Sequence, residues 1–368
     1  MALKDTLLAT LGPLLVLLVV GATAGAQRPA VGAIRWDAWT EGSEWEANLG
    51  PQQWRDRLPF YGEEIGPDQV RIRADTQAVM DQEIAYAGAA GLDYWACCFS
   101  LPTDLNAEAD EYALKLHLSS EHKTDVHFSL LLMGPGWWGP KEEYGRAAEA
   151  FVRYFRDPAY QTVAGGRPLL FIFYVEALTQ YFGSDEAARA ALDLIRTKAV
   201  EAGLQPPLIV AQVWSAESGA QYVDRLGFDA VSGYTMVDFT NGDQEYPYRT
   251  LAAANQAYWE ACRAAGKQVV PIVNAGWDHR PRWRDPKRYE ELYQSPPRGP
   301  WYTQPTPQEL ADNLRAAVGW VEAHPEAAQP QAVLIYAWNE SDEGGWLVPT
   351  LSEGTARLDA IAEVLRGQ

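Results

Sequence analysis

Three carboxylates lie within four residues near the C-terminal end of the chain: Glu340, Asp342 and Glu343. They directly follow an apolar run, residues 332–337, that predicts a buried strand. Clustered carboxylates repel one another, and removal from water raises their pKa values. That arrangement suits a general acid better than a structural turn. The alternative is a solvated acidic turn after the strand, and Asp342 is the member that we expect to be solvated or to tune the pKa values of its neighbours.

The elements that must position these carboxylates alternate regularly along the chain. The sequence predicts strands at residues 31–39, 92–99, 126–133, 168–175, 208–214, 229–236, 268–275 and 332–339, with helices at 76–90, 108–121, 142–156, 185–202, 218–226, 250–265, 306–323 and 354–365. Several strand runs are continuously apolar, as in parallel strands covered by helices. The pattern predicts an α/β fold, a single (β/α)8 TIM barrel over residues 27–368. An open doubly wound sheet is the alternative, but it usually has a glycine fingerprint after its first strand.

In such a barrel, catalytic groups come from the C-terminal ends of the strands. Nearly every predicted strand end offers an aromatic residue, and several add a carboxylate or an amide. The candidate substrate-binding residues are Asp37, Trp39, Trp137, Tyr174, Glu176, Trp214, Tyr234, Trp277, Asp278, Asn339 and Trp346. Aromatic faces can stack on sugar rings, although each tryptophan alone could equally fill the core. Their convergence at one face of the barrel favours a sugar-binding cleft.

Carboxylate-driven glycoside hydrolysis is the chemistry that these residues favour. The reaction needs an acid that protonates the leaving oxygen and a second carboxylate that acts as nucleophile or base, and we assign these roles to Glu340 and Glu343. The five histidines have no zinc-binding spacing, and the chain has neither a G-x-S-x-G elbow nor a P-loop. We therefore expect no metal and no cofactor. A non-catalytic carbohydrate-binding barrel and a polysaccharide-assembly glycosyltransferase remain open.

The composition restricts the partners of the protein. A net charge of −19 repels nucleic acid and anionic lipid, so we expect a neutral or cationic oligosaccharide or polysaccharide substrate and a monomeric protein. Cys97, Cys98 and Cys262 do not form a disulfide framework, and we expect all three to be buried. His117 and His122 are expected on the surface of a helix.

The first 26 residues differ from the rest of the chain. An apolar run from Leu7 to Val20 precedes a stretch of small residues that ends at Ala26. This pattern predicts a secretory signal peptide, cleaved after Ala26, and a secreted or periplasmic protein without a membrane anchor. A retained signal-anchor helix is the alternative, because the apolar run nearly reaches the ~20 residues that span a bilayer.

The motif Asn339-Glu340-x-x-Glu343-Gly344 resembles the N-E-x-x-E-G signature of glycoside hydrolase family 99 and of the related WbsX-like proteins of bacterial polysaccharide loci. Shorter stretches that are similar to the family lie at residues 73–83, 89–95, 166–168, 227–230, 277–282 and 346–350. Together they extend the resemblance over most of the chain after residue 30.

The resemblance implies a retaining mechanism through a 1,2-anhydro sugar, as in endo-α-mannosidases. Glu343 would be the acid/base, and Glu340 would deprotonate the substrate's own 2-hydroxyl. From the residues alone, an ordinary displacement by Glu340, Asp37 or Glu176 stays open. The chain departs from the mannosidases at Ser341-Asp342, where they tend to have Trp-His, and at Gly134-Pro135, where a substrate-binding carboxylate is expected.

Overall fold

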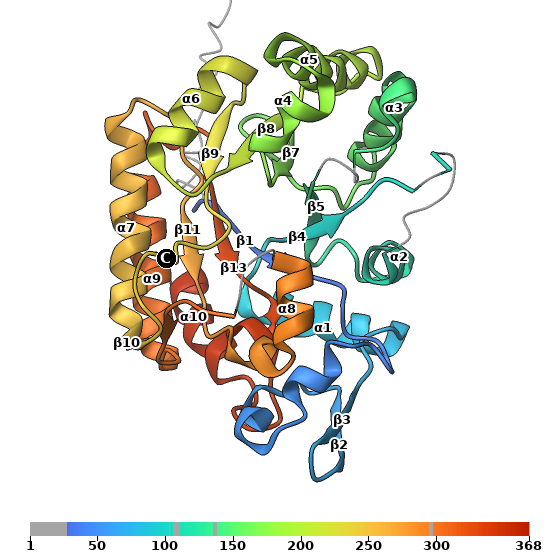
Figure 1. Ribbon diagram of the computed structural model, residues 1–368. Helices are drawn as coiled ribbons and strands as arrows, with labels where there is room; N and C mark the ends of the chain where they lie inside the picture. Colours follow the sequence, from blue (N-terminus) through green and yellow to red (C-terminus); the bar gives the residue numbers. More distant parts are fainter. Residues whose placement is uncertain (1–27, 103, 106–110, 135–137, 294–296, 368) are drawn as a thin grey trace, which may run out of the picture.

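The computed structural model describes residues 28–367 except 103, 106–110, 135–137 and 294–296. Within this part, eight parallel strands form a nearly closed barrel surrounded by helices (Figure 1), which confirms the predicted fold class. The barrel strands are β1 (Ala30–Arg35), β4 (Tyr94–Phe99), β5 (His127–Leu132), β7 (Arg167–Ile172), β8 (Leu208–Gln212), β9 (Ala230–Ser232), β11 (Ile272–Asn274) and β13 (Ala332–Tyr336). A parallel bridge between Val231 and Val269 joins β9 to the segment that leads into β11. The predicted signal peptide and Trp137 lie outside the described residues.

The apolar strand runs are buried because helices cover their outer face and side chains fill the interior of the barrel. Gly32 of β1 shows how tightly the interior is filled. A Cβ atom at this position would lie 2.4 Å from the ring of Tyr94 on the neighbouring strand β4. The ring of Tyr94 stacks on Phe171 of β7 across the barrel, with 6.5 Å between ring centroids. The interior is therefore a packed core, and ligands are restricted to its ends.

The eight predicted helices are all present. They are α1 (Gln77–Ala90), α2 (Tyr112–Ser119), α3 (Tyr144–Phe155), α5 (Asp185–Glu201), α6 (Ala216–Leu226), α7 (Tyr248–Ala264), α9 (Pro307–Ala323) and α10 (Ala356–Arg366). Local sequence sets their ends. Gly91 stops α1 in the left-handed conformation at φ 86°. Thr306 and Glu309 form a capping box at the start of α9.

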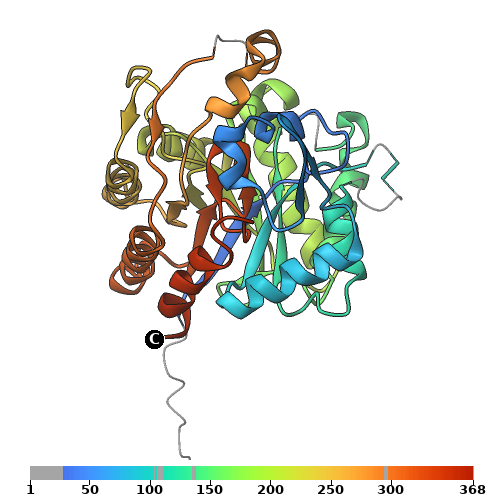
Figure 2. The same ribbon diagram turned by 90° about the horizontal axis from the view of Figure 1, so that it is seen from below.

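Several segments that the sequence did not predict are added to this framework. They are η1 (Glu46–Leu49), η2 (Gln52–Arg57), β2 (Gly62–Gly66), β3 (Gln69–Ile72), η4 (Lys141–Glu143), β6 (Thr162–Val163), α4 (Glu176–Phe182), β10 (Glu245–Tyr246), η5 (Arg280–Arg284), α8 (Pro286–Tyr293), β12 (Trp301–Tyr302), β14 (Asn339–Glu340), η6 (Ser341–Glu343) and β15 (Gly345–Trp346). Figure 2 shows α8 and the 3-10 helices that follow β1 at one end of the barrel, with the C-terminus at the other.

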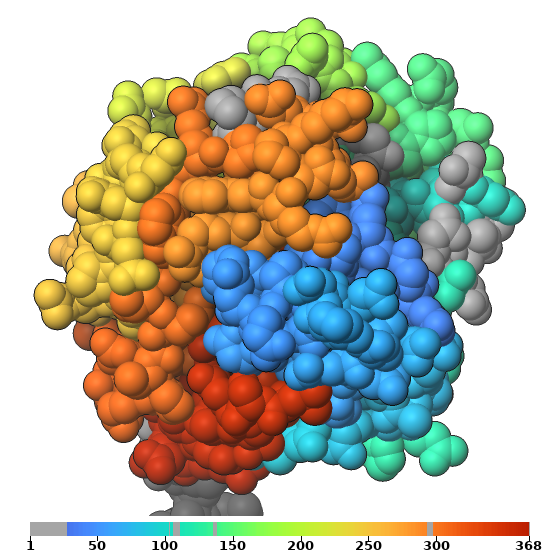
Figure 3. Space-filling model, turned by 60° about the horizontal axis from the view of Figure 1, so that its bottom comes forward, coloured from blue at the N-terminus to red at the C-terminus, as the bar shows by residue number. Residues whose placement is uncertain are grey.

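Two of these additions contact each other over the barrel. Arg284 donates a hydrogen bond to the carbonyl oxygen of Ala47 at 2.7 Å, and Arg288 forms an ion pair with Glu44. In the space-filling view of Figure 3 the orange surface that includes α8 borders the blue surface of the residues that follow β1. Two segments that are far apart in the sequence therefore cover part of the C-terminal end of the barrel.

The structure also tests the predictions for the cysteines and for His117. Cys97, Cys98 and Cys262 are all buried, as expected. The prediction for His117 was wrong. Its ring is buried between Trp95 and Phe128, and Nε2 lies 2.8 Å from the carbonyl oxygen of Val126. Among residues 28–367 as described, no helix is both long and apolar enough to cross a membrane.

Candidate active site

A cavity of about 460 Å³ opens at the C-terminal end of the barrel strands. Its wall is formed by Trp36, Trp45, Met133, Phe173, Tyr174, Trp214, Tyr234, Thr235, Phe239, Trp277, His279, Arg282, Tyr289, Arg298, Gly299, Glu340 and Glu343. Most of these side chains follow barrel strands. Trp45 directly precedes η1, and Tyr289 belongs to α8. The predicted pair of glutamates therefore shares one cavity with aromatic side chains from several strand ends.

A tight turn after β13 presents the two glutamates. β14 and β15 pair Asn339 with Trp346, and η6 lies between these strands. The turn depends on Gly344, which has φ 80° and approaches Asp278 so closely that a Cβ atom would lie 2.4 Å from its backbone nitrogen. Gly345 likewise lies against the ring of Tyr336, where a Cβ atom would be 2.5 Å away. The two glycines allow the carboxylate turn to pack directly on its neighbours.

One guanidinium group contacts all three carboxyl groups. Arg282 of η5 lies 2.8 Å from Asp342 through Nε and 3.2 Å from Glu340 through Nη2, and its Nη1 contacts Glu343. All four side chains are buried. Of the two expectations for Asp342, solvation was therefore wrong, whereas an effect on its neighbours is supported, because its charge helps to raise the pKa of Glu340. The Asp342 carboxylate also accepts a hydrogen bond from Asn48 at 2.9 Å. No role was predicted for Arg282, because it follows β11 and is distant from the carboxylates along the chain.

Aromatic faces hold this guanidinium in place. The Arg282 guanidinium carbon lies 4.9 Å from the ring centroid of Trp36 and 4.6 Å from that of Trp45. Both tryptophans line the cavity and both were missed as site residues. Trp36 lay inside the first predicted strand, residues 31–39, whereas β1 ends at Arg35 and leaves Trp36 at the strand end. Trp45 lies in the segment beyond that strand, which has no periodic pattern that would place it over the barrel.

Burial and neighbouring charge separate the two glutamates. Burial raises the pKa of Glu340 well above its usual range, and the neighbouring Glu343 raises it further. Burial opposes the ionised form of Glu343 as well, but Arg282 and His279 lower its pKa to about 2. These opposite shifts favour a proton on Glu340 and an ionised Glu343. This is a carboxyl pair with one acid and one ionised partner.

Each glutamate also has a tyrosine partner. The hydroxyl of Tyr234 donates to Glu340 Oε1 at 3.1 Å, and the hydroxyl of Tyr336 donates to Glu343 Oε2. The Nε2 atom of His279 lies 3.1 Å from Glu343 Oε1. Side chains that follow β9, β11 and β13 thus fix both carboxyls in one orientation, as preorganised acid–base chemistry requires.

Four of the predicted substrate-binding aromatics line the cavity. Tyr174, Trp214, Tyr234 and Trp277 follow β7, β8, β9 and β11 in turn. Tyr174 is 45% exposed and Trp214 is 44% exposed, whereas Tyr234 and Trp277 are buried in the deeper wall. Tyr174 has φ 48°, a left-handed conformation that a tyrosine seldom adopts, and this places its ring at the rim.

Two predicted tryptophans and one amide do not reach the cavity. Trp39 is fully buried and donates from Nε1 to the carbonyl oxygen of Asn339 at 2.7 Å. Trp346 is buried under the guanidinium of Arg357, 3.8 Å from its ring centroid. The side chain of Asn339 bonds both backbone groups of Trp36. The prediction that Trp39, Trp346 and Asn339 bind substrate is therefore corrected. Their side chains bond or pack against other parts of the protein and do not line the cavity.

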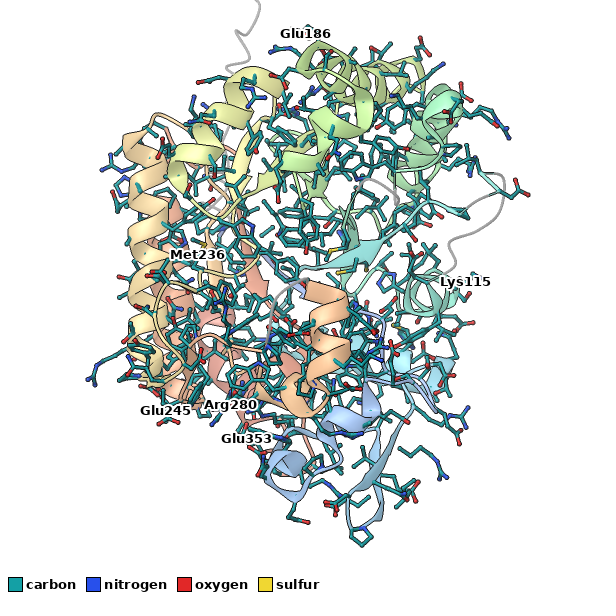
Figure 4. All side chains as sticks on the ribbon, viewed as in Figure 1. Lys115, Glu186, Met236, Glu245, Arg280 and Glu353 are labelled. Carbon is teal, nitrogen blue, oxygen red and sulfur yellow. The ribbon has the colours of Figure 1, made fainter. Side chains whose placement is uncertain are left out.

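Three predicted carboxylates also lie away from the cavity wall. Asp278 is held by Arg57 and Arg280, and its pKa is lowered because these two charges outweigh the effect of burial. Figure 4 shows Arg280 at the same edge of the molecule as Glu245, away from Met236 in the loop after β9. Asp278 therefore stabilises the structure through its ion pairs with two arginines.

The other two are Asp37 and Glu176. Asp37 is buried 3.5 Å from Arg35, and burial raises its pKa to about 7. Glu176 is exposed at the start of α4. Neither belongs to the cavity wall, so neither is placed to act as the nucleophile. Within the described part of the chain, no three His, Cys, Asp or Glu side chains group as metal ligands.

The fold resembles that of solved glycosidases. A GH99 endo-alpha-mannosidase from Bacteroides thetaiotaomicron aligns with a TM-score of 0.59 and 14% sequence identity, over 92% of this chain and 96% of that one. An exo-beta-1,4-mannosidase from Opitutaceae bacterium strain TAV5 aligns with a TM-score of 0.50 and 12% identity, over 94% of this chain and 60% of that one. At such identities the likeness concerns the fold alone.

Sequence comparison supplies the family. No curated protein sequence matches the chain. The profile of the family described as Glycosyltransferase WbsX matches residues 137–361, which is more than half of the chain and includes both glutamates. Together with the GH99-like barrel, this match shows that the chain belongs to the WbsX family of carbohydrate-active proteins.

Proposed function

We propose that this protein is a glycoside hydrolase that cleaves α-linked oligosaccharides or polysaccharides with retention of configuration, using Glu340 and Glu343 as its catalytic pair. One observation supports the proposal above the others. Two buried carboxyls lie in the wall of an aromatic-lined cavity, and their pKa values are driven in opposite directions. Such a pair supplies both the acid and the base that glycosidic cleavage needs.

The arrangement favours retention over inversion. Glu340 and Glu343 both contact the guanidinium of Arg282. An inverting enzyme needs its carboxyls roughly 6.5–9.5 Å apart to admit a water molecule between acid and base. Two carboxyls bound to one guanidinium favour the shorter separation of a retaining enzyme. We expect the first product of an α-linked substrate to have the α configuration, and a β-configured first product would contradict retention.

The ionisation of the free protein bears on the roles within the pair. The raised pKa of Glu340 favours this residue as the acid that protonates the leaving oxygen. The family resemblance gives this role to Glu343. The two assignments can be separated with a glycosyl fluoride, whose leaving group needs no protonation. The Glu→Gln variant of the acid retains activity on the fluoride and loses it on the natural glycan, whereas the variant of the other glutamate loses both.

The experiment that tests the function uses Glu340→Gln and Glu343→Gln against a panel of bacterial, fungal and plant polysaccharides. We expect each variant to lose about 10²–10⁴-fold in kcat on any glycan that the parent cleaves. Glu176→Gln is the matched control, since Glu176 is an exposed carboxylate outside the cavity wall, and it should keep full activity. Parental rates in both cavity variants would refute the catalytic assignment of this pair, whereas binding of a glycan that the parent does not cleave would support a carbohydrate-binding barrel.

A glycosyltransferase is the second candidate, because the matching family is described by that activity. The requirement for a nucleotide-sugar donor separates the hydrolase from the transferase. A hydrolase releases new reducing ends from glycan in buffer alone, while a transferase forms product only when a nucleotide sugar is supplied. Release of reducing ends without a donor therefore supports the hydrolase.

A further inference from the structure

Arg298 is a cation in the cavity wall that no carboxylate of the described residues neutralises. It lines the same cavity as Glu340 and Glu343, and within the described part of the chain it forms no ion pair and no hydrogen bond. Arg282, by contrast, is committed to three carboxylates. In a protein with 49 acidic and 30 basic side chains, a free guanidinium beside a cavity is not explained by internal pairing.

The backbone beside Arg298 is held firmly. Gly299 donates its N–H to Asp243 Oδ1 at 2.7 Å. Gly299 also lies against Phe239, where a Cβ atom would be 3.2 Å from the ring, and its φ of 125° belongs to glycine. Asp243 is thus an acidic residue close to Arg298 in the fold, and its carboxylate accepts the hydrogen bond from the Gly299 backbone. These contacts fix the backbone that carries Arg298, an exposed side chain that lines the same cavity as Phe239.

Exposed aromatic rings continue this rim. Tyr174, Trp214 and Phe239 are 45%, 44% and 51% exposed, and all three line the cavity. Phe173 supports two of them, with ring centroids 4.3 Å from Tyr174 and 5.6 Å from Trp214. Large aromatics gathered at the edge of a cavity mark a binding surface. Flat rings of this kind can receive the apolar faces of sugar rings.

We propose that the cavity binds a glycan with an anionic substituent, a carboxylate or a sulfate, and that Arg298 recognises this group. The proposal deepens the proposed function and rests on it for the sugar backbone of the ligand. The fork of N–H donors in a guanidinium fits both oxyanions with paired hydrogen bonds. The net charge of −19 favoured a neutral substrate. The cavity modifies that expectation locally, because its two carboxyl groups, Glu340 and Glu343, both contact Arg282, whereas Arg298 has no carboxylate partner among the described residues.

Direct binding, measured by titration calorimetry, tests the proposal without requiring turnover. The probes are two matched pairs: α-linked oligogalacturonate with its carboxyl-reduced form, and sulfated dextran with unsulfated dextran oligosaccharide. The variants are Arg298→Gln and the control Arg249→Gln. Arg249 is an exposed arginine of α7 without a described partner and outside the cavity wall, so it changes the net charge equally.

We expect the parent to bind at least one charged probe about tenfold more tightly than its neutral partner, a difference of ~1.4 kcal/mol. Arg298→Gln should abolish this preference, Arg249→Gln should keep it, and added salt should weaken it. Preference for oligogalacturonate indicates a carboxylate ligand, and preference for sulfated dextran indicates a sulfate. Equal binding within both pairs, including no binding at all, would overturn the inference.

The same measurements separate this inference from the proposed function. If Arg298→Gln lacks the preference while no glycan is hydrolysed, the anion site stands and the hydrolase proposal fails. If neutral glycans are cleaved and charged probes have no advantage, the hydrolase stands and the anion site fails.

Discussion

Replacement of Arg282 by methionine tests the central electrostatic argument. The side chain is buried, and it contacts three buried carboxylates, Glu340, Asp342 and Glu343. Removal of one partner from a buried charge pair costs about 3–5 kcal/mol, because the remaining charge stays in the interior without compensation. Methionine keeps much of the apolar contact with the tryptophans. We therefore expect the free energy of unfolding at pH 7 to fall by about 3–5 kcal/mol, measured by urea denaturation.

The loss should depend on pH with a defined sign. In the parent, the pKa of Glu343 is lowered from 4.5 to about 2 despite its burial, largely by Arg282. A lowered carboxyl pKa contributes stability that is present above 4.5 and is lost as pH falls towards 2. Without Arg282 this contribution disappears at every pH. The difference between parent and variant should therefore be largest above pH 4.5 and should shrink as the pH falls below it.

Arg288→Met is the matched control. Arg288 stacks on the same Trp45, 5.5 Å from its ring centroid, but its ion pair with Glu44 is partly exposed. We expect a loss of about 0–1 kcal/mol. An equal loss for both variants, or a loss for Arg282→Met that is the same at pH 7 and pH 3, would show that packing on the tryptophans matters and that charge compensation does not.

Three further predictions concern ionisation and processing. The kcat/KM should fall as pH rises through the elevated pKa of Glu340, and a pH–rate profile with its only limb near pH 4–5 would contradict the proton placement. Asp37→Asn should stabilise the protein above pH 7 by up to about 4 kcal/mol, because burial raises the pKa of this carboxyl to about 7 from 3.8 and its ionisation opposes folding. The effect should vanish below pH 3.8, and a pH-independent effect in urea denaturation would exclude this explanation. N-terminal sequencing of the secreted protein should find Gln27 first, and an intact Met1 in a membrane fraction would instead indicate a retained anchor.

The sequence was sufficient to predict the barrel strands and the surrounding helices, because both depend on the local periodicity of apolar residues. Apolar strand runs alternate with amphipathic helices, and Thr306 and Gly91 mark helix ends by their backbone chemistry. A strand that ends just before Glu340 places this residue at the C-terminal end of a barrel. The positions of the two glutamates and of four cavity-lining aromatics therefore followed from local pattern and the barrel rule.

Tertiary structure decided the composition and ionisation of the site. Arg282 lies 58 residues before Glu340, and Trp45 lies in a segment without periodic pattern, yet the three share one cavity. Sequence also could not distinguish Trp214 at the rim from Trp346 in the core, since both follow strands and only the direction of the side chain differs. Proximity across the chain and burial set the pKa values, and neither is a property of local sequence. The chain alone thus determined where chemistry could occur, while folding determined the opposite pKa shifts of the two carboxyls.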